Sequence, residues 1–438
     1  MNRLGMLAAS FLFLTFTINT HATSLEHRGY LIKLKNTVSA MSTKSFINSL
    51  GVEVESEIPE LQVLVSNKNP LVVTKNSPLA SELSQLIEYV EPNYVVRAGE
   101  LEFDPTFLPP PYPSTGMWGL DAIKVQEAWE ITRGSRDITV AISDTGMWTH
   151  GDLMKNFWKN PGEMGLDTNG NNKAINKIDD DQNGFIDDVR GWNFEGNINN
   201  PIDTHYHGTH VGGTVGAVGD DNNSGISGVS GLVSLIDTKF LDRDGSGTID
   251  NGIKTVLYAA RMGAKAVNCS WGGDGYSQTF YDAIEYAKNK GTIVVTAAGN
   301  SSSDNDKTPS YPASYNNENI ISVAALDSNK QNLTWFSSKG ATTVDIAAPG
   351  IHIYSTYNPT HSQLRRYYYE HLAGTSMAAP HVTGTIALMY SANPQLNWKQ
   401  VKDIILATAI KAPKLEGKVL TGGYLNTGAA VKAATATP

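Results

Sequence analysis

Short apolar runs alternate with amphipathic stretches along the chain from residue 117 onward. The runs predict buried strands at 138–142, 232–239, 266–270, 292–296 and 320–324. Apolar periods of three to four residues predict helices at 252–262, 280–290 and 401–409. Apolar strands that alternate with helices are typical of an α/β fold with a mostly parallel, doubly wound sheet.

A different order of elements precedes this region. Strand patterns fall at 30–34, 52–54, 61–65 and 94–96, and helical patterns at 44–50 and 79–87. Strand, helix, strand, strand, helix, strand is the split βαβ order of a small α+β, ferredoxin-like domain. We therefore expect one domain at 23–97 and a second at 117–438. Residues 98–116 contain five prolines and read as an exposed linker that proteases can cut.

The first 22 residues resemble a secretory signal peptide. Arg3 supplies a positive start, residues 4–18 form an apolar run, and Thr20-His21-Ala22 ends the segment near a small-residue cleavage site. The alternative is a membrane anchor, but the run is short for a bilayer span. The pattern predicts export, to the cell exterior or the periplasm, with no membrane span after the signal is removed.

Charge and cysteine content narrow the function classes. The 438 residues carry a formal net charge of −9, which argues against a nucleic-acid backbone as the partner and suits cation binding or solubility. The single cysteine, Cys269, excludes an intramolecular disulfide. Because it lies in an apolar run, a buried structural role is favoured over a reactive thiol.

Four polar positions could together hydrolyse an amide bond. Asp144 ends a predicted strand and could orient a base, and His207 opens a glycine-rich stretch in which a helix begins. Ser376 follows Gly-Thr at the start of a predicted helix, where free N–H groups favour negative charge on oxygen. Asn300 follows a strand and offers an amide donor for an oxyanion. Alone, Asp144 and Asn300 could be turn residues, Ser376 could be a helix cap, and His207 could be a metal ligand.

The order Asp, His, Ser distinguishes this arrangement from other serine-hydrolase folds. With it, the chain resembles the subtilisin-like serine proteases, through the motifs Ser143-Asp144-Thr145-Gly146, His207-Gly208-Thr209-His210, Ala298-Gly299-Asn300 and Gly374-Thr375-Ser376-Met377-Ala378-Ala379-Pro380. The resemblance covers residues 118–433. The domain at 23–97 is similar to the inhibitory propeptide of that family.

The resemblance implies a self-processing zymogen of a serine endopeptidase. Ser376 would attack the scissile carbonyl, His207 would transfer the proton, and Asp144 would hold the imidazole. Asn300 and the N–H of Ser376 would bind the oxyanion. His210 and His381 would be structural. The propeptide, an intramolecular inhibitor, would be cut off between residues 97 and 115.

The resemblance also implies two chain segments that bind a peptide substrate between them as a strand. They are Gly245-Ser246-Gly247 and Ser270-Trp271-Gly272. Partners would be protein or peptide substrates. Trp271 would either line a pocket for a bulky apolar substrate residue or belong to the scaffold.

Acidic loops suggest calcium as a structural cofactor. Asp179, Asp181, Asn183 and Asp187 have the spacing of an EF-type loop, although Arg190 occupies the position of its final glutamate. A solvated acidic loop is the alternative. Residues 242–250 have similar spacing but overlap the expected substrate segment. A second calcium site, implied by the resemblance, would use Asp152 and Asn222.

Two other functions remain open at this stage. A binding module that keeps the fold without catalysis would lack a reactive serine. A zinc hydrolase would use His205, His207 and His210, but the His-Glu-x-x-His pattern is absent.

Overall fold

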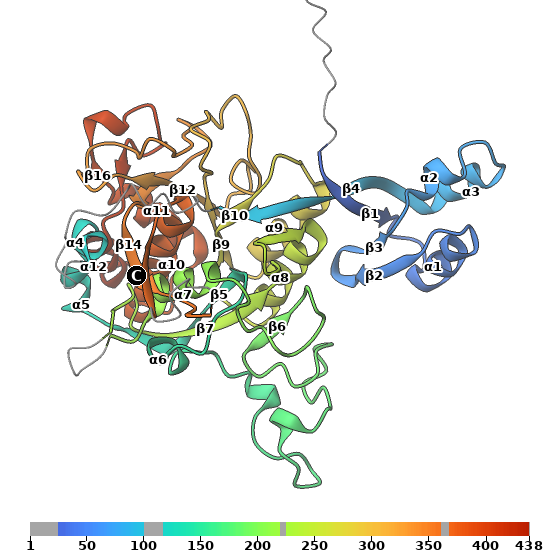
Figure 1. Ribbon diagram of the computed structural model, residues 1–438, viewed down its shortest axis with the longest axis horizontal. Coiled ribbons are helices and arrows are strands. Elements are labelled where there is room, and N and C mark those ends of the chain that lie inside the picture. Colours follow the sequence, from blue (N-terminus) through green and yellow to red (C-terminus); the bar gives the residue numbers. More distant parts are fainter. Residues whose placement is uncertain (1–24, 100–116, 220–224, 361–367, 438) are drawn as a thin grey trace, which may run out of the picture.

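The computed structural model describes residues 25–99, 117–219, 225–360 and 368–437. The predicted signal segment, nearly all of the predicted linker, and Asn222 lie outside the described residues. Figure 1 shows a small N-terminal unit beside a larger α/β body, with the long strand β4 reaching from one to the other.

The N-terminal unit is a four-stranded antiparallel sheet in the order β4-β1-β3-β2, with helices on one side. Residues such as Ile32, Ile47 and Leu83 fill a separate apolar core between the sheet and the helices. This confirms the predicted small α+β domain. Its elements are β1 (His27–Leu34), α1 (Ala40–Ser49), β2 (Val54–Ile58), a 3₁₀ turn (Pro59–Leu61), β3 (Val63–Ser66), α2 (Pro70–Val73), α3 (Leu79–Leu86) and β4 (Ile87–Ala98).

The body is built on a nine-stranded sheet in the order β16-β17-β13-β12-β11-β9-β5-β7-β6. All neighbouring pairs are parallel except β16 with β17. The predicted mostly parallel, doubly wound sheet is therefore confirmed. Its strands are β5 (Gly134–Asp144), β6 (Gly191–Asn193), β7 (Leu232–Lys239), β9 (Ala266–Cys269), β11 (Ile293–Ala297), β12 (Ile320–Leu326), β13 (Ile346–Pro349), β16 (Ile410–Lys411) and β17 (Gly423–Tyr424).

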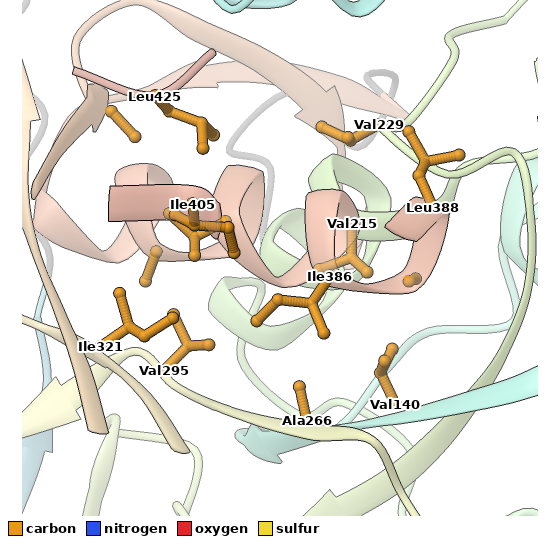
Figure 2. Close-up of a cluster of buried hydrophobic side chains, with 14 of the residues drawn as sticks. Val140, Val215, Val229, Ala266, Val295, Ile321, Ile386, Leu388, Ile405 and Leu425 are labelled. Atoms are coloured by element: carbon orange, nitrogen blue, oxygen red, sulfur yellow. The ribbon is translucent and has the colours of Figure 1, made fainter. Parts of the chain in front are cut away.

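Helices cover both faces because successive strand residues point to opposite sides. Val140 and Ile142 of β5 join the core beneath α7, α10, α11 and α12, as Figure 2 shows for Val140, whereas Ala141 faces α8 and α9. The helices of the body are α4 (Trp118–Ala122), α5 (Val125–Trp129), α6 (Gly151–Met154), α7 (His207–Gly216), α8 (Ile249–Arg261), α9 (Gln278–Asn289), α10 (Thr375–Ala392), α11 (Trp398–Ala407) and α12 (Thr427–Ala436).

Several smaller elements of the body lie outside the nine-stranded sheet and its covering helices. Between α6 and β6 the chain makes a long excursion, drawn in green in Figure 1, which carries the predicted EF-type loop. The remaining elements are 3₁₀ turns at Pro161–Glu163, Lys173–Ile175 and Pro413–Leu415, the antiparallel pair β14 (Ile353–Thr356) and β15 (Tyr369–Leu372), and the short strands β8 (Ser246–Thr248) and β10 (Trp271–Gly272). Among the described residues, no helix combines the length and apolarity needed to cross a bilayer.

The carboxyl ends of the central strands gather the polar motifs at one edge of the sheet. Strand β5 ends at Asp144, and Asn300 follows β11 by three residues. Helix α7 begins at His207, and α10 begins one residue before Ser376. In a parallel sheet these strand ends share an edge, so residues far apart in sequence meet there.

Candidate active site

Asp144 and His207 form the buried pair of the site. The Nδ1 atom of His207 lies 2.8 Å and 3.0 Å from the two carboxylate oxygens of Asp144, and neither side chain is exposed. The backbone N–H of Thr145 donates a further hydrogen bond to Asp144, at 2.7 Å. A carboxylate at Nδ1 keeps the proton on that atom and leaves Nε2 as the basic nitrogen.

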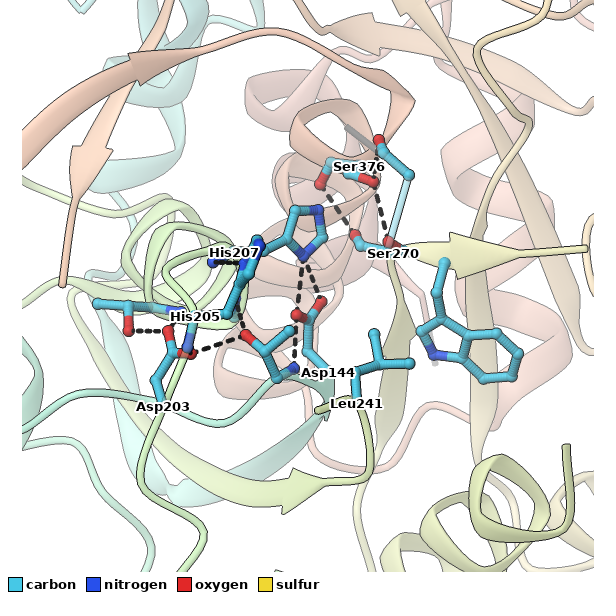
Figure 3. A network of polar contacts seen from close by, with 12 residues as sticks. Asp144, Asp203, His205, His207, Leu241, Ser270 and Ser376 are labelled. Atoms are coloured by element: carbon cyan, nitrogen blue, oxygen red, sulfur yellow. Dashed lines mark hydrogen bonds and ion pairs between the residues drawn. The ribbon is translucent and has the colours of Figure 1, made fainter. Parts of the chain in front are cut away.

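Ser376 completes the group from the first turn of α10. Figure 3 shows the ring of His207 between Asp144 and Ser376. The Ser376 hydroxyl oxygen lies 2.5 Å from the carbonyl oxygen of Gly99 and 2.9 Å from that of Ser270. The structure therefore brings together the three residues that sequence predicted as a triad.

A proline inside α10 explains how this helix start is tied to the sheet. Pro380 has no N–H, so the carbonyl of Ser376, four residues earlier, has no helical donor. The hydroxyl of Ser270 donates to this carbonyl instead, at 2.9 Å. The end of β9 and the start of α10 are thereby held together at the serine.

Asn300 is aimed at the same carbonyl oxygen as Ser376. Its Oδ1 accepts hydrogen bonds from the backbone N–H and the hydroxyl of Thr375, both at 2.9 Å. Because both groups on that side are donors, the amide nitrogen must face the other way, and it lies 2.7 Å from the Gly99 oxygen. This is the geometry of an oxyanion donor.

The end of β4 lies as a strand between β8 and β10. Val96 pairs with Gly247 and Arg97 with Ser246 on one side, while Ala98 pairs with Trp271 on the other. Two further backbone bonds extend the pairing, from the N–H of Ala98 to Gly245 (2.8 Å) and from that of Gly99 to Ser270 (3.1 Å). The segments expected to bind substrate thus hold the tail of the N-terminal unit.

Trp271 belongs to the core beneath this strand. Its ring stacks on Phe280 and meets Phe240 edge-on, and only 1% of the residue is exposed. Val96 of β4 lies in the same apolar cluster and is also buried. Two roles were expected for Trp271, in the scaffold or in a substrate pocket. The buried ring is part of the scaffold, and it belongs to the same apolar cluster as Val96.

Two side chains of β4 cap helices of the body. The Glu91 carboxylate accepts hydrogen bonds from the Ser277 hydroxyl (2.7 Å) and from two N–H groups at the start of α9, at 2.8 and 3.1 Å. Asn93 exchanges two hydrogen bonds with Asp250 at the start of α8, of 2.9 and 3.0 Å. No local sequence pattern indicates either contact, because the partners lie more than 150 residues apart along the chain.

The other motif histidines and the cysteine are buried structural groups. His381 Nδ1 lies 2.8 Å from the Met377 carbonyl, and His210 Nε2 lies 2.9 Å from that of Ile353. Burial lowers the pKa of His381 to about 4 and that of His210 to about 3, so both are neutral at pH 7. Burial raises the pKa of Cys269, which removes thiolate reactivity. His207 and His210 point to different partners, which does not support a shared zinc ion.

The excursion before β6 contains a cluster of carboxylates. Oxygens of Glu163, Asp179 and Asp181 lie within 4.8 Å of one another. Glu163 is fully buried; one of its oxygens accepts from the N–H of Asp180 at 2.8 Å, and the other has no protein partner. Burial raises the pKa of Glu163, as expected for a carboxylate that lacks a counter-charge. A buried, unpaired oxygen beside two more carboxylates suits a hard cation.

The other two residues of the predicted EF-type set are placed differently. Both carboxylate oxygens of Asp187 accept from the N–H of Lys177, at 3.2 Å. The amide nitrogen of Asn183 donates to Asp181 and Asp188, and its oxygen accepts from the N–H of Phe185. Glu163 was missed because it lies 16 residues before the acidic run, in a separate turn.

The remaining acidic candidates have protein partners. Asp152 accepts 2.9 Å hydrogen bonds from the Ile226 N–H and the Tyr369 hydroxyl. Its expected partner Asn222 lies outside the described residues. Asp242, in the second acidic loop, accepts from the N–H groups of Asp244 and Ser246 and so shapes the turn into β8.

This fold, with an Asp–His pair and a helix-start serine at the sheet edge, defines the class of subtilisin-type hydrolases. A model of the subtilase family matches residues 135–430. The chain belongs to the subtilase family of serine proteases.

Individual relatives agree with this assignment. The chain is 36% identical to thermitase from Thermoactinomyces vulgaris, over 72% of this chain and 93% of that protein. It is 32% identical to a thermophilic serine proteinase from Bacillus sp. (strain AK1), over 91% and 84%. The chain is 34% identical to subtilisin-like protease 1 of Plasmodium falciparum over 73% of its own length. The match spans 47% of that protein, about half of its length.

A solved structure supports the fold. Fervidolysin from Fervidobacterium pennivorans, described as a keratinolytic enzyme related to subtilisin, superposes with a TM-score of 0.68. The match covers 93% of this chain and 61% of that one, at 24% sequence identity. At this identity the likeness concerns the fold alone.

Proposed function

We propose that the protein is a secreted serine endopeptidase that is made as a self-processing zymogen. One observation carries this proposal. The carbonyl oxygen of Gly99 lies 2.7 Å from the amide nitrogen of Asn300 and 2.5 Å from the hydroxyl oxygen of Ser376. In Figure 3 the ring of His207, which is hydrogen-bonded to Asp144, lies between Asp144 and Ser376. A carbonyl oxygen that lies beside an amide donor and a serine hydroxyl supports the roles of Asn300 as oxyanion donor and of Ser376 as nucleophile.

The reaction follows from this geometry. The Ser376 oxygen attacks the scissile carbonyl carbon while Nε2 of His207 takes the hydroxyl proton. Asp144 stabilises the resulting imidazolium through Nδ1–H, and the Asn300 amide donates to the oxyanion. His207 then gives its proton to the leaving amine, and an acyl-enzyme remains. Water then attacks the acyl carbon while the same imidazole takes its proton. The bond to the Ser376 oxygen breaks as His207 returns that proton to it, and the acid product is released.

The N-terminal unit would act as an inhibitory propeptide. Its last strand occupies the cleft as a substrate would, and the caps made by Glu91 and Asn93 anchor it to the body. We expect cleavage of the bond that follows Gly99, within the range of residues 97–115 expected from sequence, because the Gly99 carbonyl oxygen lies beside Ser376 and Asn300. The domain would therefore extend from residue 23 to residue 99.

The same strand suggests the substrate preference. Val96 is the fourth residue before the proposed cleavage point and is 3% exposed within the apolar cluster around Trp271 and Leu241. Arg97 is exposed at the neighbouring position. We expect extended peptides with an apolar side chain four residues before the scissile bond, because the Val96 side chain is buried in this apolar cluster.

Calcium and export complete the proposal. Glu163, Asp179 and Asp181 fit a calcium ion, which would supply the charge that the buried carboxylates lack and brace the excursion. The apolar run of residues 4–18 supports export with removal of residues 1–22.

Mass spectrometry of the wild type and of Ser376→Ala tests the mechanism and the cleavage point together. The wild-type precursor should lose the residues through Gly99 and then digest an unfolded protein, whereas Ser376→Ala should keep them. Maturation of Ser376→Ala at the wild-type rate would overturn the nucleophile assignment. Failure of a fluorophosphonate probe to label the matured wild type would favour the non-catalytic binding module.

A further inference from the structure

A carboxylate outside the triad joins the two segments that carry Asp144 and His207. Asp203 is 1% exposed and accepts four hydrogen bonds. One oxygen accepts from the Thr145 hydroxyl (2.9 Å) and the N–H of His205 (2.8 Å). The other accepts from the N–H of Thr209 (3.1 Å) and its hydroxyl (2.5 Å). Figure 3 shows Asp203 beside the Asp144–His207 pair.

The hydroxyl groups of Thr145 and Thr209 each act as a relay, a hydroxyl that bonds to Asp203 and to the backbone of the other segment. The Thr145 hydroxyl, which donates to Asp203, accepts from the N–H of Gly208, the residue after His207, at 2.9 Å. The Thr209 hydroxyl, which also donates to Asp203, accepts from the N–H of Trp148 at 2.9 Å. Each relay therefore crosses from the Asp144 turn to the first turn of α7.

The backbones of the Asp144 turn and of the first turn of α7 approach closely at Gly208. A Cβ atom on Gly208 would lie 2.2 Å from the carbonyl oxygen of Gly146, so only glycine permits this approach. Small shifts between the two segments would change the distance between Asp144 and His207 directly. The contacts that fix the approach thus bear on the catalytic pair.

A buried lysine balances the charge of Asp203. Lys239 is 2% exposed, and its ammonium group donates to the carbonyls of Thr145 (2.8 Å) and Leu241 (2.7 Å) and to the Thr204 hydroxyl (3.1 Å). Burial raises the pKa of Asp203 and lowers that of Lys239, and the attraction between the two charges opposes both changes. This attraction acts through space, because the hydrogen bonds of the Lys239 ammonium group go to Thr145, Thr204 and Leu241.

We propose that Asp203, charge-balanced by Lys239, is a positioning residue that holds the Asp144 turn against the start of α7 and so fixes the Asp144–His207 hydrogen bond. The inference rests on the proposed function of that pair. Asp203 does not touch the substrate strand; it acts through Thr145 and Thr209.

The pH profile separates positioning from mere stability. The titratable groups on the elements packed around His207 include Asp144 on β5, Asp203 and His205 before α7, Asp237 and Lys239 on β7, His210 on α7, and Glu370 and His371 on β15. Asp203→Asn removes a negative charge and loosens the Asp144 contact. Both effects disfavour the imidazolium, so the acidic limb of kcat/KM should move to lower pH.

The experiment compares Asp203→Asn with Asp345→Asn, counting active sites by fluorophosphonate labelling. Asp345 is also a buried carboxylate with a lysine partner, Lys402 at 3.6 Å, but it lies on the segment before β13. We expect Asp203→Asn to lower kcat by about 10- to 100-fold, with KM within about twofold. Asp345→Asn should lower the melting temperature but leave kcat and the acidic limb unchanged.

A gentler pair of variants serves if Asp203→Asn fails to fold. Thr209→Val removes one relay hydroxyl at nearly constant volume, and Thr209→Ser keeps it. We expect Thr209→Val to lower kcat by about tenfold and Thr209→Ser to restore most of that loss. Equal kcat in the two variants would overturn the proposal.

The outcomes distinguish failure of the positioning role from failure of the proposed function. If the wild type labels and turns over but Asp203→Asn keeps its kcat and acidic limb, the positioning role is wrong and the proposed function stands. If the wild type neither labels nor cleaves peptides, the proposed function fails, and the positioning role with it.

Discussion

At the residue scale, the orientation of Asn300 depends on its neighbour Thr375. Two donors at Oδ1 leave the amide N–H₂ group directed at the Gly99 carbonyl. Asn300→Ala should lower kcat by about 10²- to 10³-fold with little change in KM, because the donor matters most when charge develops on the oxygen. Steady-state kinetics on a peptide substrate measure this.

Asn319→Ala is the matched control for Asn300. Asn319 is a buried asparagine whose amide donates to the carbonyls of Ile284 and Thr292, not to groups around Ser376. Its removal should reduce stability and leave kcat within about twofold of the wild type. If both variants lost kcat equally, Asn300 would not be a specific oxyanion donor.

Burial of His381 should make the folded protein less stable at acid pH. The folded-state pKa of His381 is about 4, below the ordinary value of 6.5, so between these pH values only the unfolded chain binds the proton. Stability is therefore complete above pH 6.5 and falls as the pH is lowered toward 4. His381 alone should make the protein about 2 kcal/mol less stable at pH 5 than at pH 8.

Denaturant unfolding of the Ser376→Ala protein at the two pH values measures this difference without self-digestion. His381→Gln should be less stable overall but should show a smaller difference between pH 8 and pH 5. Some difference will remain, since burial also lowers the pKa of His210, to about 3. An unchanged difference in His381→Gln would contradict the assignment.

At the scale of elements, β4 links the N-terminal unit to the body through helix capping. The Glu91 carboxylate accepts three hydrogen bonds at the start of α9, where the helix dipole also favours negative charge. If the N-terminal unit is cleaved off as proposed, Glu91→Ala should weaken its complex with the body by about 10- to 100-fold, the effect of losing hydrogen bonds to a charged group.

Dilution of the freshly processed complex measures this affinity, since enzyme activity appears as the propeptide dissociates. Glu88→Ala is the control, because Glu88 lies on the same strand but is exposed. Activity should appear at higher protein concentration in Glu91→Ala and at the wild-type concentration in Glu88→Ala. Identical dilution curves for all three proteins would show that the cap does not contribute.

Local sequence patterns predicted the long central elements and missed the short ones. The runs at 138–142 and 320–324 lie inside β5 and β12, because buried parallel strands must be apolar on both faces. Strands β8 and β10, of three and two residues, have no pattern of their own. They are strands only because β4 pairs with them, and that pairing joins residues far apart in the sequence.

At the scale of the whole molecule, the sequence predicted those site residues that lie within recognisable motifs. Asp144, His207, Ser376 and Asn300 were each named from local sequence, and the sheet brings them together. Asp203 and Lys239 were not, because a buried carboxylate and a buried lysine have no local signature. The same holds for Glu163, whose partners follow after a long loop.

The last prediction concerns calcium and the whole molecule. If the ion binds Glu163, Asp179 and Asp181, it stabilises the folded state by about 2.7 kcal/mol at a hundredfold excess over its dissociation constant. Chelation should therefore lower the melting temperature of Ser376→Ala and expose the excursion before β6 to an added protease. Glu163→Ala should lose most of this calcium response, whereas Glu130→Ala, which removes an exposed glutamate at the end of α5, should keep it. Direct calcium titration by calorimetry gives the stoichiometry, and equal binding by Glu163→Ala and wild type would place the ion elsewhere.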